Sequence, residues 1–208
     1  MALQGAASLR SRRLVLASAS PRRQELLRNA GIAFEICAAN IQESPLPGEL
    51  PQAHAERLAR EKAQALFIQY PHDFILGADT IVVIENEILG KPRDEQDAAR
   101  MLRLLSGRTH HVITGVCLLG PDLRTENREP RTGFEDTRSE LTNVTLAELT
   151  AQDIHAYIAT REPMDKAGAY AIQGVPSHWI SRIEGDYFNV VGLPIALVYR
   201  MLKEHGGM

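Results

Sequence analysis

The sequence predicts an α/β fold in which a mixed, twisted sheet is flanked by helices, within one domain spanning residues 14–208. Short apolar runs, typical of buried strands, alternate along the chain with segments whose apolar residues recur at helical spacing. Some strand-like runs follow one another after only a short turn, so we expect hairpins and not a purely parallel sheet. The 208 residues suffice for a sizeable core, and the 44% hydrophobic and 24% charged fractions are typical of a soluble globular protein.

Charge and composition disfavour several classes of function. The net charge of −3 predicts no general attraction for nucleic acid or an anionic membrane, so an anion site has to be a local cluster. Residues 1–13 are expected to form a flexible leader, because they contain three arginines but no apolar core of signal-peptide length. Cys37 and Cys117 lie in apolar runs without metal-binding spacing, which predicts buried, reduced thiols and a cytoplasmic location.

The first segment with chemical content is a strand followed at once by a helix. Leu14–Ala17 is expected to be a buried strand, and Ser20 to cap a helix that begins with proline and carries Arg22 and Arg23. A helix start presents free backbone N–H groups, so this junction, with the Ser18 hydroxyl, is suited to cradle a phosphate. The alternative is an ordinary strand–helix junction with two solvated arginines.

A proline-rich loop and a long helix come next. A strand is predicted over 33–38, followed by a loop over Asn40–Pro51 that contains three prolines and Glu43. The apolar spacing predicts an amphipathic helix over Gln52–Gln69. Lys62 lies near the apolar stripe of this helix, so its ammonium either extends to water or points into a site.

An acidic residue interrupts the apolar stretch Phe74–Ile84. A carboxylate at Asp79 is costly unless it is paired, binds a metal or accepts local backbone N–H groups. A hairpin turn is expected at Glu85–Glu87. Lys91 follows on a stiff loop between a glycine and a proline, which is a suitable position for a fixed charge.

The remaining segments complete the predicted sheet and helices. His110 and His111 should point to opposite faces of a strand, so they do not share a metal. Helices are expected over 94–105, after Thr150 and over 195–204, and strands over 112–119, 141–146 and 179–183. The polar segment Gly120–Glu140 is expected to be a long hairpin tip or a partly disordered loop.

Residues 162–174 form a second segment with chemical content. Its small residues permit close approach of a ligand to the backbone. Lys166 adds a charge, and the Gln173 amide both donates and accepts, so it is able to read the edge of a base. A plain turn is the alternative interpretation.

The polar candidates form a set that suits a polyphosphate. Several cations attract a triphosphate strongly in a partly dry cleft, and two carboxylates suit a Mg²⁺ shared with phosphate oxygens. A carboxylate near the metal can also accept the proton of an attacking water. No P-loop, GxGxxG or HExxH motif occurs. The donors are Ser18, Arg22, Arg23, Lys62, Lys91 and Lys166, and the acids are Glu43 and Asp79.

A series of motifs extends this pattern over most of the chain. They are SASPRRQELL (18–27), LAREKA (58–63), GADTIV (77–82), GKPRD (90–94), LSGRTHHVITGV (105–116), DKAGAYAIQG (165–174) and VVGLP (190–194). In this order they resemble the Maf family of nucleoside triphosphate pyrophosphatases. The resemblance implies a two-lobed α/β architecture similar to that of inosine triphosphatase, with a cleft between the lobes. It also implies a cytoplasmic homodimer that uses Mg²⁺ or Mn²⁺ to convert nucleoside triphosphates to monophosphate and pyrophosphate, and so to clear nucleotide pools.

The resemblance also implies roles for individual residues. Asp79 matches the proton acceptor of the family, and Glu43 matches an acid near the metal, which the two would hold together. The phosphate-binding and triphosphate-adjacent positions are matched by Ser18, Arg22, Arg23, Lys62 and Lys91.

Base choice is implied by a further set of positions. Arg22, Thr80 and Gln173 match the residues that select the base in the family. Threonine after the aspartate, and IQG after KAGAY, resemble the branch that acts on dTTP and UTP.

The chain departs from the family pattern in places, and alternatives stay open. Gln42-Glu43 replaces the usual acidic pair, and the loop at 120–140 and the leader are longer than usual. One alternative is the same reaction on 7-methyl-GTP or CTP. Another is a non-catalytic nucleotide-binding regulator of septum formation, although a pure binder does not need a base at Asp79. A link to division arrest is expected for the pyrophosphatase itself.

Overall fold

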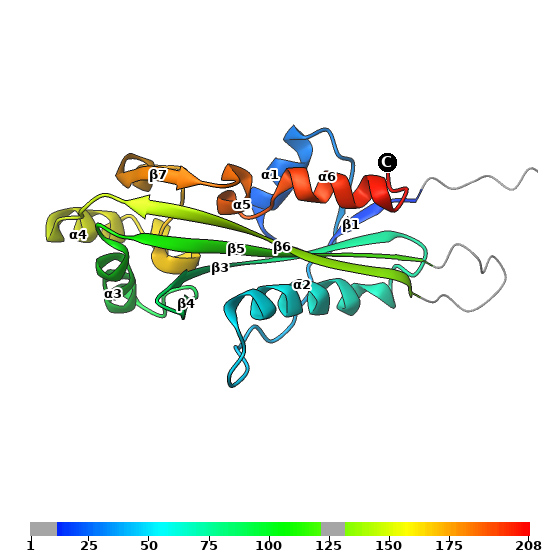
Figure 1. The fold of residues 1–208 in the computed structure, drawn as a ribbon, viewed down its shortest axis with the longest axis horizontal. Helices are drawn as coiled ribbons and strands as arrows, with labels where there is room; N and C mark the ends of the chain where they lie inside the picture. The colour runs from blue at the N-terminus through cyan, green and yellow to red at the C-terminus, as the bar shows by residue number, and fades with distance from the viewer. Residues whose placement is uncertain (1–11, 122–131) are drawn as a thin grey trace, which may run out of the picture.

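The strands form one mixed sheet in the order β2-β1-β3-β5-β6-β7, with β4 beside β3 (Figure 1). The structure, a computed structural model, describes residues 12–121 and 132–208. β1 is parallel to β2 and β3 and the other pairs are antiparallel, so the predicted mixed sheet is confirmed. The strands are β1 (Leu14–Leu16), β2 (Glu35–Ile36), β3 (Phe74–Ile84), β4 (Glu87–Leu89), β5 (Thr109–Pro121), β6 (Thr132–Leu146) and β7 (Ile180–Glu184).

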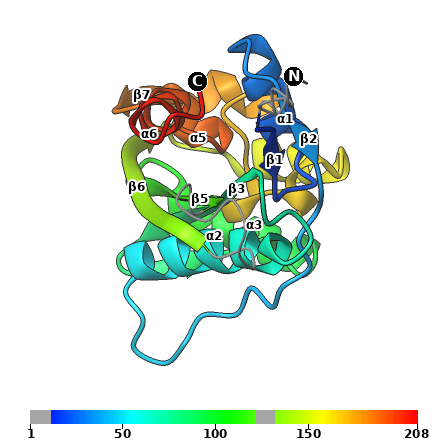
Figure 2. The ribbon, with the colours of Figure 1, turned by 90° about the vertical axis from the view of Figure 1, so that its right-hand side faces the viewer.

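Helices cover both faces of this sheet. α2 lies along one face, and α1, α5 and α6 lie on the opposite face (Figures 1 and 2). α3 and α4 pack together around a separate apolar cluster that includes Leu102 and Tyr157. No helix in the described ranges is long and apolar enough to cross a membrane. The helices are α1 (Pro21–Asn29), α2 (Pro51–Phe67), α3 (Glu95–Leu105), α4 (Ala151–Ala159), α5 (Tyr187–Val191) and α6 (Ile195–Glu204).

Two glycines bring α2 into direct contact with the backbone of the sheet. A Cβ at Gly77 of β3 would lie 2.0 Å from the Ala59 carbonyl oxygen, and one at Gly115 of β5 would lie 2.2 Å from that of Ala55. A side chain at either position would push the helix away, because packed interiors have no spare volume. The glycines therefore determine how closely the side chains of α2 approach β3.

One edge of β3 is open along part of its length. On this edge β1 pairs with Phe74–Leu76 and β4 pairs with Val82–Ile84. No strand of the described chain pairs with this edge at Gly77–Ile81. The carboxyl end of β1 leads to α1 at the same place, and crevices beyond the carboxyl ends of parallel strands are common binding sites.

β5 and β6 pair as an antiparallel hairpin, as the hairpin alternative for Gly120–Glu140 predicts, but the residues of this segment that the structure describes lie in the two strands and not in a loop. β5 continues to Pro121, and β6 already begins at Thr132, while 122–131 lie outside the described residues, as does most of the predicted leader at 1–13. The β6 segment lacks an apolar face because most of its side chains are partly or fully exposed, and many are polar. A strand whose side chains are partly exposed on both faces needs no alternating apolar residues, so its sequence looks like a loop.

The second strand, the two cysteines and the turn after β3 follow the predictions in part. The strand predicted over 33–38 is reduced to Glu35–Ile36, and Cys37 is half-buried and not buried. Cys117 is buried as expected, and burial raises the pKa of its thiol to about 11. The predicted hairpin turn is confirmed by positive φ angles of 50° and 66° at Glu85 and Asn86.

Other local predictions are confirmed. Ser20 caps α1, and Thr150 forms a capping box with Asp153 at the start of α4. His110 is buried and His111 is exposed, so the two histidines do face opposite sides of β5.

We predict that Gly77→Ala lowers the free energy of unfolding by about 1–3 kcal/mol, because the new methyl group overlaps the backbone of α2. Urea denaturation measures the loss. Gly90→Ala is the matched control, since nothing lies within 4 Å of a Cβ there, and it should change stability by less than about 0.5 kcal/mol. Equal stability of the two variants would contradict the close contact between α2 and β3.

Candidate active site

The open edge of β3 borders a cavity of about 630 Å³. Its walls come from the turn after β1, the start of α1, the loop before α2, α2 itself, β3, and the segments 165–173 and 190–192. The structure therefore brings together the candidates that the sequence analysis selected from separate motifs. The candidates that line the cavity are Ser18, Arg22, Arg23, Glu43, Lys62, Asp79, Thr80, Lys91, Lys166 and Gln173.

A buried ion pair lies in the cavity wall. The Lys62 ammonium on α2 donates to Asp79 Oδ1 on β3 at 2.6 Å, and the two side chains are only 9% and 10% exposed. Lys62 thus points into the site and does not extend to water. The Asp79 carboxylate, which interrupts the apolar strand, is paired with a cation from another element, as a buried charge requires.

A second carboxylate meets the same ammonium. Glu43 Oε1 lies 2.6 Å from Lys62 Nζ, and the Glu43 side chain is 50% exposed. Partial burial raises the pKa of Glu43, but the hydrogen bond and charge of Lys62, together with the charge of Lys91, outweigh it and leave that pKa below its ordinary value. Glu43 is therefore ionised at neutral pH, and two carboxylates converge on one lysine.

Arg23 connects three parts of the cavity wall. Its guanidinium donates to the Gly192 carbonyl at 2.8 Å, to Ser18 Oγ at 3.2 Å and to Thr80 Oγ1 at 3.0 Å. Burial lowers the pKa of Arg23 below its ordinary value, partly offset by the negative charge of Asp79. The alternative of two solvated arginines is wrong for Arg23, because much of its donor capacity already goes to the protein.

The Thr80 hydroxyl belongs to a polar network that continues across the sheet. Its oxygen lies 2.9 Å from Thr114 Oγ1, and Thr114 donates to the Asn189 carbonyl at 3.1 Å. The side-chain Nδ2 of Asn189 in turn donates to Thr142 Oγ1 at 2.9 Å, and Asn189 is fully buried. Thr80 is thus held in one orientation at the cavity wall.

The remaining candidates differ in how accessible they are. Lys91 and Gln173 are exposed, and Arg22 is half-buried with a guanidinium nitrogen 3.9 Å from an Asp165 oxygen. The Lys166 side chain is only 12% exposed, and its ammonium donates to the Glu162 carbonyl at 2.8 Å and to Asp165 at 2.6 Å. Lys166 therefore stabilises its own turn, whereas Arg22 and Lys91 present charge to the cavity.

Comparison with known proteins assigns the chain to a family. The family model described as Maf-like protein matches residues 13–205. The chain belongs to the Maf family. A dTTP/UTP pyrophosphatase of Koribacter versatilis is 55% identical over 193 residues, covering 93% of this chain and 94% of the relative. Proteins of the same name from Geobacillus sp. (47% identical; 94% of this chain and 99% of the relative) and Geobacter sulfurreducens (50%; 94% and 98%) also match. Among solved structures, a nucleoside-triphosphatase (dITP/XTP pyrophosphatase) of Mycobacterium abscessus aligns with a TM-score of 0.40 at 13% identity, over 67% of this chain and 76% of that chain.

The acids of this Maf site fit a metal ion that is shared with its ligand. Glu43 and Asp79 converge on one point, where Lys62 now balances their charge. In the described residues no group of three or more histidine, cysteine or acidic side chains could hold a metal by itself. Two carboxylates match a Mg²⁺ whose other positions are filled by phosphate oxygens and water.

Some residues of the Maf site were missed in the sequence. His54 of α2 lines the cavity and is 3% exposed, and a histidine next to the apolar stripe was the signal that could have revealed it. Tyr170 also lines the cavity, and its hydroxyl lies 2.6 Å from His110 Nε2. Burial lowers the pKa of His110 to about 4, so the neutral ring holds Tyr170 at neutral pH.

We predict that Lys62→Met lowers the free energy of unfolding by about 3–5 kcal/mol, because it leaves the buried Asp79 carboxylate without its cation. Lys62→Met/Asp79→Asn should be more stable than Lys62→Met alone, since no unpaired charge is then buried. Chemical denaturation of both variants tests this, with exposed Lys203→Met on α6 as the control. If Lys62→Met were as stable as the parent, the buried pair would not exist as described.

Proposed function

We propose that this protein is a nucleoside triphosphate pyrophosphatase that hydrolyses dTTP and UTP to the monophosphate and pyrophosphate. The observation that carries the proposal is that a buried carboxylate, a second acid and several cations meet in one cavity. The relatives named dTTP/UTP pyrophosphatase, 47–55% identical over nearly the whole chain, support both the reaction and the base.

The cavity wall suits a triphosphate. Arg22 and Lys91 present positive charge to it, and the start of α1 adds the partial charge of a helix N-terminus. Charges in a partly enclosed cavity interact more strongly than in bulk water. We therefore place the phosphates between the start of α1 and the Lys91 loop, where these cations also stabilise the departing pyrophosphate.

Asp79 is the group we assign to activate water. Its carboxylate accepts a proton from a water as the water oxygen bonds to the α-phosphorus. The bond from that phosphorus to the bridging oxygen breaks, and pyrophosphate leaves. Lys62, 2.6 Å from Asp79 Oδ1, holds the carboxylate in position for this transfer.

Glu43 and Asp79 would together hold a Mg²⁺ or Mn²⁺ with the phosphate oxygens. When bound, such an ion supplies Lewis-acid stabilisation of the charge that develops on the phosphates. Lys62 already brings the two carboxylates together, so the protein side of the site is formed before any ligand enters.

Gln173, Thr80 and Arg22 are the residues we assign to base choice. The exposed Gln173 amide forms no hydrogen bond with the described residues, so its donor and acceptor are both available to the O4 and N3–H of uracil or thymine. The Thr80 hydroxyl is held in its network and shapes the wall beside it.

We also propose, from family membership, that the protein is a cytoplasmic homodimer. Light scattering of the purified protein tests the oligomeric state.

We predict that Asp79→Asn lowers kcat for dTTP by at least ~100-fold, the usual contribution of a general base. Pyrophosphate release with Mg²⁺ or Mn²⁺ measures the change. Asp73→Asn is a matched control, because Asp73 is a buried acid directly before the same strand, paired with Arg13 outside the cavity. Near-normal turnover by Asp79→Asn would rule out its role as the base.

We predict that the parent protein turns over dTTP and UTP faster than dATP, CTP or 7-methyl-GTP in a nucleotide panel.

Gln173→Ala should raise KM for dTTP by about tenfold and reduce the preference for dTTP over dATP, because a base-reading amide is lost. Gln152→Ala, at an exposed position on α4, is the control. An unchanged preference would show that Gln173 does not read the base, and binding without pyrophosphate release would favour a regulator.

A further inference from the structure

The Glu43 carboxylate is presented to the site by a loop without regular secondary structure. The loop spans residues 40–50, between β2 and α2, and hangs below α2 away from the sheet (Figures 1 and 2). Half of the Glu43 side chain is exposed, so packing alone does not hold it at Lys62. Some other contact has to keep the loop in place if Glu43 is to meet Lys62 reproducibly.

One arginine of α2 makes that contact. Arg57 Nε and Nη2 donate to the two Glu49 carboxylate oxygens at 2.6 and 2.8 Å. The same Nη2 lies 3.1 Å from the Ser44 carbonyl, directly after Glu43. Nη1 donates to Glu61, one turn further along the helix, at 3.0 Å. The planar fork of the guanidinium thus joins both ends of the segment 44–49 to one side of α2.

The hydrogen bonds from Arg57 to Glu49 and Ser44 are called the clamp below. Glu49, which accepts two of these bonds, is itself held by further contacts. Glu49 is only 9% exposed, and its Oε2 also accepts from the Leu46 amide at 3.1 Å and lies 2.9 Å from Nδ1 of the buried His54. The Glu49 amide in turn donates to the Leu46 carbonyl at 3.1 Å. The side chain of Glu49 is thus satisfied from three directions, as expected of a fixed structural carboxylate.

We propose that Arg57 is a positioning residue that holds the loop 40–50 so that Glu43 stays at Lys62 and Asp79. Arg57 and Lys62 lie on one rigid helix, so a loop bound to the first is presented to the second at constant distance. The importance of this for turnover rests on the proposed function, whereas its effect on the loop does not.

Hydrogen bonding by Arg57 lowers the pKa of Glu49 to about 2. The carboxylate is therefore ionised at any pH near neutrality, and the clamp does not open on mild acidification. Its removal requires a substitution, which makes the inference testable at one pH.

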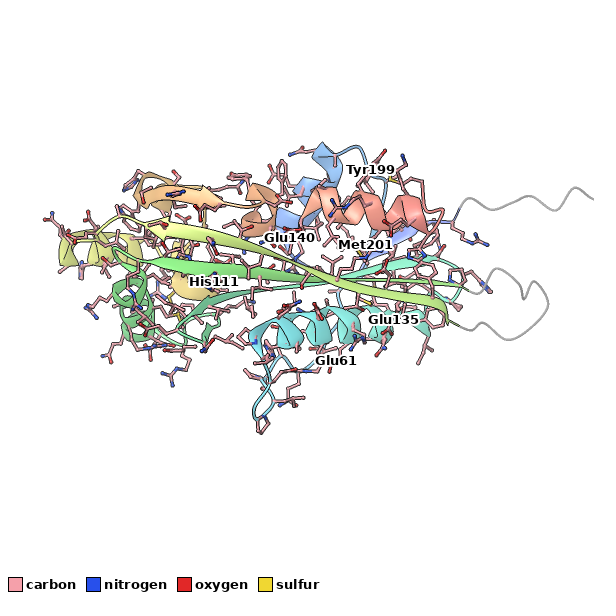
Figure 3. All side chains as sticks on the ribbon, viewed as in Figure 1. Glu61, His111, Glu135, Glu140, Tyr199 and Met201 are labelled. Atoms are coloured by element: carbon pink, nitrogen blue, oxygen red, sulfur yellow. The ribbon has the colours of Figure 1, made fainter. Side chains whose placement is uncertain are left out.

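The first test is amide hydrogen exchange of the ligand-free protein. Arg57→Met should raise the exchange rates of the Leu46 and Glu49 amides roughly tenfold or more, because the hydrogen-bonded turn is no longer attached to α2. Arg60→Met is the matched control. Arg60 lies on the same helix but pairs with Glu135 of β6 at 2.8 Å, so it should leave these amides unchanged. Figure 3 labels Glu61 of α2 and Glu135 of β6, the acids with which Arg57 and Arg60 pair.

The second test is a double-mutant cycle in which turnover is measured for Arg57→Met, Glu43→Gln and the pair. Each single variant should change kcat/KM for dTTP by a similar factor, roughly tenfold to a hundredfold, the scale for partners that orient a ligand of a metal. The double variant should be no worse than either single variant, since both remove the same contact. Glu49→Gln breaks the clamp from the loop side and serves if Arg57→Met does not fold.

Each result decides the inference. Faster exchange at Leu46 and Glu49 with a non-additive cycle supports it. Unchanged exchange overturns it, and so does faster exchange with kinetics that are unchanged or strictly additive. If the parent protein hydrolysed no nucleotide at all, the proposed function would fail, while exchange would still show whether Arg57 holds the loop.

Discussion

The site depends on the buried contact between Lys62 and Asp79. Each charge alone would be expensive to remove from water, and each makes the burial of the other tolerable only at close range. This pair forces α2 and β3 to meet at one register, because a shift of the helix by one residue would turn the ammonium away from the carboxylate. The result is a carboxylate that is fixed in orientation at the wall of a cavity.

The backbone is built so that this contact can form beside an open space. Gly77 and Gly115 let α2 lie against the sheet, which brings Lys62 to the level of Asp79. Along one edge of β3, the pairing with β1 ends before Asp79 and the pairing with β4 begins after it. This edge of β3 is therefore free where the acid lies. A continuous sheet edge would have closed this space, and a loosely packed helix would have left the acid unpaired.

The sequence reveals the members of the site better than their individual tasks. Asp79 and Lys62 could be predicted because a charge within an apolar pattern is visible in the sequence and has few physical explanations. Arg22 and Arg23 are adjacent, and only the packing of α1 decides that Arg23 is buried among Ser18, Thr80 and Gly192 while Arg22 remains accessible.

The parts that could not be predicted share a cause. The extension of β6 carries polar side chains on a solvated surface, so nothing in its sequence distinguishes it from a loop. The contacts of Arg57 with Glu49 and Ser44 depend on the path of a loop rich in proline, which has no periodicity to read. Local patterns thus report what is buried, whereas contacts between a loop and a helix surface require the tertiary structure.

We infer that a nucleoside triphosphate binds in this cavity with its α-phosphorus toward Asp79. A crystal structure with α,β-imido-dUTP, which cannot be cleaved between these phosphates, tests it most directly. We expect the phosphates to lie between the start of α1, Lys62 and Lys91, with the α-phosphorus facing the Asp79 carboxylate and the uracil beside Gln173. Phosphates bound outside this cavity, or an α-phosphorus turned away from Asp79, would contradict it.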